Sequence, residues 1–123
     1  MKSKILIVDD DWSILEMLKF TLNTSGYEVV AAQNCDDFFK TAWLTKPDVI
    51  ILDIMLGDRD GVQAYEELLT QGFDPKIPVV FLSVLAQDIT PTPPQKGRTY
   101  ALIAKPFDPG TLVQQIDCLV GRD

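Results

Sequence analysis

Val49-Ile-Ile-Leu-Asp53 is a run of four apolar residues that ends in a carboxylate. Short apolar runs rich in β-branched residues are typical of strands that are covered on both faces, as in a parallel sheet. Residues 4–8, Lys-Ile-Leu-Ile-Val, have the same character and lead directly into Asp9-Asp10-Asp11. We therefore predict two buried strands whose carboxyl ends carry acidic side chains.

Helical patterns alternate with strands along the rest of the chain. Apolar residues recur at three- and four-residue spacing over residues 14–22, and Gly26 is placed to end that helix in a left-handed cap. The remaining predicted elements are strands at 27–32, 78–83 and 100–104 and helices that begin near residues 34, 61 and 108. A polar loop rich in glycine and aspartate, residues 57–61, is predicted to lead into the helix that begins near residue 61. Five strands that alternate with helices indicate an α/β fold with a doubly wound five-stranded parallel sheet.

One segment interrupts the alternation. Between the fourth and fifth predicted strands, where a helix is expected, residues 85–98 include Pro91, Pro93 and Pro94. Each proline inside an α-helix removes a backbone donor and clashes with the preceding turn, at a cost of about 3 kcal/mol. We therefore predict a fourth helix that is irregular, shortened or absent.

The composition indicates one acidic domain. With 123 residues, of which 46% are hydrophobic, the chain can form a single buried core, so we predict one domain over residues 1–123. Its 18 acidic and 11 basic residues give a net charge of −7, which repels phosphate backbones. Direct binding to nucleic acid is therefore not expected.

Membrane and zinc sites are also not expected. No apolar run approaches the roughly 20 residues that span a bilayer, and the start of the chain lacks a signal-peptide pattern, so we expect a cytoplasmic protein. The two cysteines, Cys35 and Cys118, fall in different predicted helices, and no histidine is present to complete a zinc site. Free cysteines tend to be buried, and we expect this of both.

Polar residues of complementary chemistry follow the predicted strands. Acidic residues follow the first strand, Asp53 ends the third, Ser83 ends the fourth and Lys105-Pro106 follows the fifth. In a doubly wound sheet these ends share one edge, where ligands bind. Clustered carboxylates repel one another unless a cation is present, and an oxygen-only set favours Mg²⁺, with Mn²⁺ as the alternative.

The same residues have ordinary structural explanations when each is taken alone. Asp10 or Asp11 could cap the first helix, Asp53 could be a turn residue, Ser83 a loop hydroxyl, and Lys105 a solvated lysine. Taken together they form a site at four strand ends of one sheet. We predict that Asp53 is a nucleophile that forms an aspartyl phosphate, whose oxygens contact the cation, the Lys105 ammonium and the Ser83 hydroxyl.

The chain resembles a response-regulator receiver domain over its whole length. The resemblance lies in residues 5–11 (Ile-Leu-Ile-Val-Asp-Asp-Asp), 53–61 (Asp-Ile-Met-Leu-Gly-Asp-Arg-Asp-Gly) and 105–107 (Lys-Pro-Phe). It implies the flavodoxin-like strand order 2-1-3-4-5, a cation held by Asp9, Asp10, Asp53 and the backbone carbonyl of Met55, and Ser83 as the switch hydroxyl. A cis bond before Pro106 is implied as well.

The resemblance also implies a role and partners. Such a domain is not an enzyme but a regulatory phosphoacceptor that assists its own phosphorylation and dephosphorylation. The donor would be a phosphohistidine on a sensor histidine kinase or a histidine phosphotransfer protein. Output would pass to an unknown downstream protein or a fused output domain, with a phosphorylation-dependent dimer as a further expectation. One departure is Leu102, which stands three positions before Lys105, where the family has an aromatic switch residue.

Three other functions compete with this interpretation. A flavodoxin-like electron carrier shares the fold order, but three aspartates after the first strand would repel its phosphate. An Mg²⁺-dependent phosphohydrolase would resemble its relatives in carrying an acid two residues after the nucleophile, where this chain has Met55. A degenerate receiver that binds partners without phosphorylation is suggested by Leu102 and the prolines.

Overall fold

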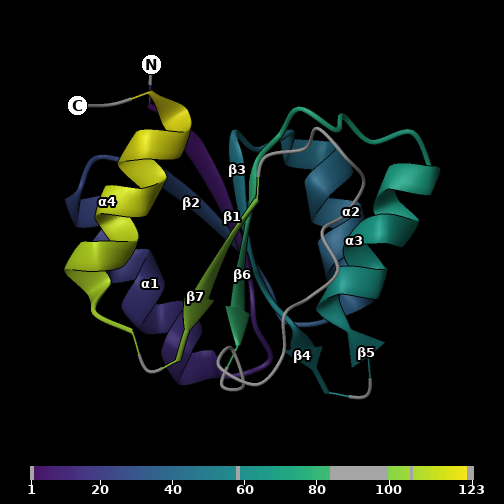
Figure 1. Ribbon diagram of the computed structural model, residues 1–123, viewed down its shortest axis with the longest axis horizontal. Helices are drawn as coiled ribbons and strands as arrows, with labels where there is room; N and C mark the ends of the chain where they lie inside the picture. Colours follow the sequence, from purple (N-terminus) through teal and green to yellow (C-terminus); the bar gives the residue numbers. More distant parts are fainter. Residues whose placement is uncertain (1, 58, 84–99, 106, 122–123) are drawn as a thin grey trace.

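The computed structural model describes residues 2–57, 59–83, 100–105 and 107–121. A five-stranded parallel sheet crosses its centre (Figure 1). The strands of this sheet are β1 (Lys4–Val8), β2 (Glu28–Ala32), β3 (Val49–Asp53), β6 (Val79–Ser83) and β7 (Tyr100–Ala104). Their spatial order is β2-β1-β3-β6-β7, which confirms the predicted order 2-1-3-4-5.

Helices cover both faces of the sheet. The described helices are α1 (Trp12–Thr24), α2 (Cys35–Thr45), α3 (Gly61–Thr70) and α4 (Pro109–Val120). Figure 1 shows α1 and α4 on one face and α2 and α3 on the other. This three-layer arrangement follows from the two-sided burial that the apolar strands predict.

Each face of the sheet has its own apolar core. In β3, Val49 and Ile51 pack with α1 and α4, whereas Ile50 and Leu52 pack with α2 and α3. The alternation is the period-two pattern of an extended strand. Full burial of each such side chain contributes about 1.5–3 kcal/mol, so the central strands are the most strongly held part of the fold.

Local signals at the helix ends behave as predicted. Gly26 follows the end of α1 with φ +93°, Asn34 caps α2, and Asp108 caps α4 immediately before Pro109. The burial prediction for cysteine is confirmed for Cys35 and wrong for Cys118, which is exposed. Cys118 lies two positions after the buried Ile116, or about 200° around the helix, on the side that faces away from the sheet.

The segment after Asp53 has more structure than the predicted loop. Strands β4 (Met55–Leu56) and β5 (Arg59–Asp60) form a small antiparallel hairpin, in which Met55 pairs with Asp60 and Leu56 with Arg59. Gly57 adopts φ +63° in the turn, a conformation that glycine reaches without strain. The loop prediction was therefore incomplete.

The irregular fourth helix was predicted from residues 85–98, which lie outside the described residues. Among the helices that are described, none is long and apolar enough to cross a membrane.

Candidate active site

The carboxyl edge of the sheet brings Asp9, Asp53 and Lys105 together. Asp9 directly follows β1, Asp53 ends β3, and Lys105 directly follows β7. The Lys105 Nζ lies 2.7 Å from Asp9 Oδ2 and 3.0 Å from Asp53 Oδ2, so one ammonium donates to two carboxylates. Asp9 and Asp53 are only 1% and 6% exposed, respectively, and this lysine is their charge partner in a poorly hydrated site.

Backbone amides hold the second oxygen of each carboxylate. The Asp11 N–H donates to Asp9 Oδ1 at 2.9 Å, and the Met55 N–H donates to Asp53 Oδ1 at 3.0 Å. Buried polar groups that are hydrogen-bonded on both sides have a restricted orientation. The side chain of Asp11 caps α1 by accepting a hydrogen bond from the Ser13 N–H, which is the helix-capping role that the sequence suggests for Asp10 or Asp11.

Asp10 completes a cluster of three carboxylates. One oxygen each from Asp9, Asp10 and Asp53 lies within 4.8 Å of the others, and Asp10 is the exposed member. Three carboxylates and the Lys105 ammonium leave a net charge of −2, which a divalent cation would neutralise. The donor set contains only oxygen, which suits Mg²⁺ or another hard cation.

Burial and pairing shift the pKa values of two groups in this site. Burial raises the pKa of the Asp9 carboxyl above its ordinary value, although the hydrogen bond from Lys105 offsets part of the shift. Burial alone would lower the pKa of Lys105, but its hydrogen bonds to Asp9 and Asp53 outweigh burial and raise it. Lys105 therefore stays protonated at neutral pH, as the cation between two buried carboxylates.

Ser83 ends the neighbouring strand β6 and is buried. Its backbone carbonyl accepts a hydrogen bond from the Lys105 N–H at 2.9 Å, so the two predicted site residues are joined through their backbones. The predicted contact of the Ser83 hydroxyl with a phosphoryl group stays a prediction, and so does the predicted role of the Met55 carbonyl as a cation ligand.

Leu102, at the predicted position of the aromatic switch residue, is half-buried and packs against the core below α2 and α3. The predicted cis bond involves Pro106, which lies outside the described residues.

Gly61 is a site residue whose role the sequence does not reveal. A β carbon at this position would overlap the backbone oxygen of Asp53, and the Gly61 N–H donates to Ile54 O at 2.5 Å. The first residue of α3 therefore packs directly on the backbone of Asp53. A glycine eight positions after a strand-end aspartate is the available signal in the sequence, but that spacing does not by itself indicate contact with the Asp53 backbone.

A family model and a curated relative match nearly the whole chain. The model of the response regulator receiver domain family matches residues 5–117. The alkaline phosphatase synthesis transcriptional regulatory protein PhoP of Bacillus subtilis is 30% identical over 122 residues, which cover 99% of this chain and 50% of PhoP. The chain thus spans about half the length of this curated relative.

Solved structures share the fold over nearly the whole chain. The chemotaxis protein CheY4 of Vibrio cholerae has a TM-score of 0.79 and 29% identity, with coverage of 97% of this chain and 99% of CheY4. The receiver domain of the sensor histidine kinase PA1611 from Pseudomonas aeruginosa PAO1 has a TM-score of 0.85 and 22% identity, with coverage of 98% and 99%. That structure has a magnesium ion coordinated in its active-site cleft.

Proposed function

The chain belongs to the response regulator receiver domain family, and from this premise we propose that it is a phosphoacceptor switch of two-component signalling, with Asp53 as the acceptor. The observation that carries the proposal is the position of Asp53, which is buried beside two further carboxylates and bonded to the Lys105 ammonium. A buried aspartate with a cationic partner at a sheet edge is suited to nucleophilic attack on phosphorus.

The proposed reaction is a transfer to one oxygen of Asp53. A carboxylate oxygen forms a bond to phosphorus while the bond from phosphorus to the histidine nitrogen breaks, and the departing imidazole nitrogen retains the electron pair and then takes a proton. Lys105 stabilises the negative charge on the phosphoryl oxygens when one of its N–H groups donates a hydrogen bond to the phosphoryl group in place of a carboxylate. We assign to Ser83 a further contact with the phosphoryl group.

Asp9, Asp10 and Asp53 would hold a divalent cation, together with the Met55 carbonyl. When bound, Mg²⁺ would neutralise charge on the transferring phosphoryl group and orient it. What supports this assignment is the all-oxygen donor set, in a site whose net charge is −2 once the Lys105 ammonium is included. The magnesium in the PA1611 receiver domain lies in a protein of the same fold.

Partners follow from the family as proposals. Receiver domains work with histidine kinases, so we propose a sensor histidine kinase or a histidine phosphotransfer protein as the phosphoryl donor. PhoP is about twice as long as this chain, which supports a fused output domain as one route of signalling and a separate downstream protein as the other. We propose residues 1–123 as the receiver unit, a regulatory module that assists its own phosphorylation and dephosphorylation.

Intact mass after incubation with Mg²⁺ and acetyl phosphate tests the proposal. We expect the protein to gain one phosphoryl group, and Asp53→Asn to gain none. Asp74→Asn is the matched control, because it removes an exposed carboxylate from the loop before β6 and should be phosphorylated like the wild type. Turnover of acetyl phosphate without an adduct would indicate a phosphohydrolase instead. A folded wild type that neither reacts nor turns over the donor would indicate a degenerate receiver.

A further inference from the structure

We propose that Arg59 is a positioning residue for phosphoryl transfer, because it fastens the hairpin that follows Asp53 to α2 and α3. This inference rests on the proposed function of Asp53. It concerns a residue on the far strand of the hairpin, which does not contact the acceptor itself. The hairpin is connected to Asp53 at both ends, and Arg59 sets its position relative to the helices.

Both ends of the hairpin touch the acceptor residue. On the first strand, the Met55 N–H donates to Asp53 Oδ1 at 3.0 Å. Directly after the second strand, Gly61 packs against the backbone oxygen of Asp53 and donates to Ile54 O. A displacement of the hairpin would therefore move a hydrogen-bond donor of the nucleophile and the packing behind it.

The hairpin has few internal interactions to keep it in place. It consists of two paired residues on each strand, and isolated two-stranded hairpins are at best marginally stable in water. Leu56 is buried and anchors one strand in the core below α2 and α3. The other strand consists of Arg59 and Asp60, both exposed, so its attachment depends on the contacts of polar side chains.

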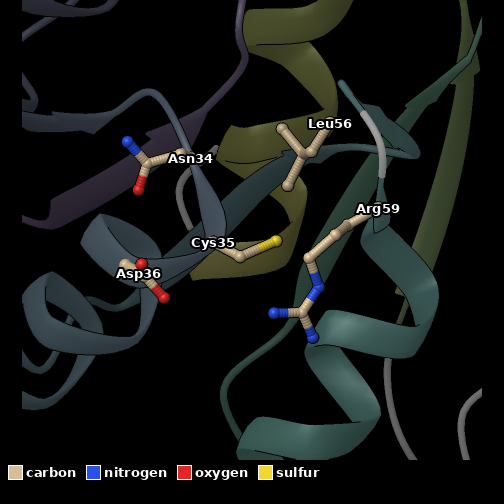
Figure 2. A pocket seen from close by; sticks show the side chains of 5 residues that line it. All are labelled: Asn34, Cys35, Asp36, Leu56 and Arg59. Carbon is tan, nitrogen blue, oxygen red and sulfur yellow. The ribbon is translucent and has the colours of Figure 1, made fainter.

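Arg59 supplies contacts to two helices. Its Nη2 lies 2.6 Å from Glu67 Oε2 on α3, and its guanidinium carbon lies 5.8 Å from the ring centroid of Phe39 on α2. Figure 2 shows the side chain reaching from the hairpin toward the first turn of α2, where it lines a cavity of about 260 Å³ with Leu56 and Cys35. One side chain thus connects β5 to both helices of this face.

The contacts of Arg59 fix the position of the hairpin but add little to the stability of the whole domain. The side chains of Arg59 and Glu67 are 42% and 47% exposed, and exposed ion pairs contribute little to the free energy of unfolding. A small displacement of a reacting group can nevertheless slow a reaction strongly, because catalysis depends on orientation. We therefore expect changes at Arg59 to alter the rate of phosphorylation more than the melting temperature.

The first measurement is the rate of phosphorylation of Arg59→Gln over a series of acetyl phosphate concentrations. We expect the limiting rate to fall about three- to tenfold, with an unchanged donor concentration at half-maximal rate, because orientation and not donor binding is altered. Arg59→Lys keeps the charge and should recover most of the rate. Lys19→Gln is the matched control, because it removes a cation from another surface pair, with Glu16, and should react like the wild type.

The second measurement is amide hydrogen exchange at Met55 without phosphodonor. We expect faster exchange in Arg59→Gln than in the wild type and in Lys19→Gln. If Arg59→Gln does not fold, Glu67→Gln and Phe39→Leu remove the same contacts from the helix side and should each slow phosphorylation. An unchanged limiting rate in a folded Arg59→Gln variant overturns the inference. A wild type that accepts no phosphoryl group overturns the proposed function instead, while exchange at Met55 still tests whether Arg59 holds the hairpin.

Discussion

At the scale of single residues, the site depends on buried groups whose orientation is restricted by hydrogen bonds. Lys105 donates to two carboxylates at once, and the second oxygen of each carboxylate is held by a backbone N–H. Gly61 has the opposite role, since it contributes by the absence of a side chain next to the backbone of Asp53. A β carbon added at Gly61 would be fixed to the backbone, and the atom it would meet is the backbone oxygen of Asp53, so neither could rotate away.

We predict that Gly61→Ala lowers the free energy of unfolding by about 1–3 kcal/mol, because the added methyl group overpacks a rigid contact. Denaturant unfolding measures this change. Gly110→Ala is the matched control, because Gly110 lies in α4 with a negative φ and its β carbon would meet the Asp108 carboxylate at 3.4 Å, so little destabilisation is expected. Equal stability of Gly61→Ala and the wild type would contradict the predicted overlap.

At the scale of secondary-structure elements, the helix ends differ in whether the residue with positive φ is a glycine. Gly26, Gly72 and Gly121 take positive φ values just after helices, where glycine is favoured. Lys46 ends α2 with φ +47° and is the non-glycine residue with positive φ among the described residues. The left-handed region costs such a residue roughly 1–2 kcal/mol because its β carbon crowds the following carbonyl oxygen.

We predict that Lys46→Gly raises the free energy of unfolding by about 0.5–1 kcal/mol, because relief of this strain exceeds the extra entropy of glycine in the unfolded chain. Thermal or denaturant unfolding at neutral pH provides the measurement. Lys46→Ala removes the same charge and keeps the strain, so it should show no such gain. If the alanine variant gained as much as the glycine variant, loss of the charge rather than relief of strain would be the cause.

At the scale of the whole molecule, the topology brings together residues that are far apart in the chain. Lys105 and Asp9 are separated by 96 positions, yet their side chains form an ion pair because β7 and β1 belong to one parallel sheet. A cation held by Asp9, Asp10 and Asp53 would likewise connect the ends of β1 and β3. Any ligand that binds only this folded arrangement stabilises the entire domain.

We predict that Mg²⁺ raises the melting temperature in a concentration-dependent way, with a stabilisation of about 2.7 kcal/mol at 100 times the dissociation constant. Asp10→Asn should remove most of this gain without disturbing the core, since Asp10 is the exposed member of the cluster. Glu16→Gln removes an exposed carboxylate from α1 and should retain the full gain. A Mg²⁺ effect of equal size in Asp10→Asn would argue against Asp10 as a ligand.

Local patterns in the sequence determined the elements and the chemistry at the strand ends. The apolar runs at 4–8 and 49–53 predict buried strands, and Asn34 and Asp108 predict helix starts, because each signal involves residues close together in the chain. The alternation of strands and helices was enough to predict the doubly wound fold. The acidic residues at these ends were enough to predict an oxygen-rich site, because parallel strands end at a common edge.

Tertiary structure alone decided which of these groups touch. The bond from Lys105 to both Asp9 and Asp53 depends on sheet register, and the exposure of Cys118 depends on which side of α4 faces the sheet. The contacts of Arg59 with α2 and α3, and the packing of Gly61 on Asp53, arise where separate elements meet. Such contacts join residues on different elements, and they form only once the layers have packed.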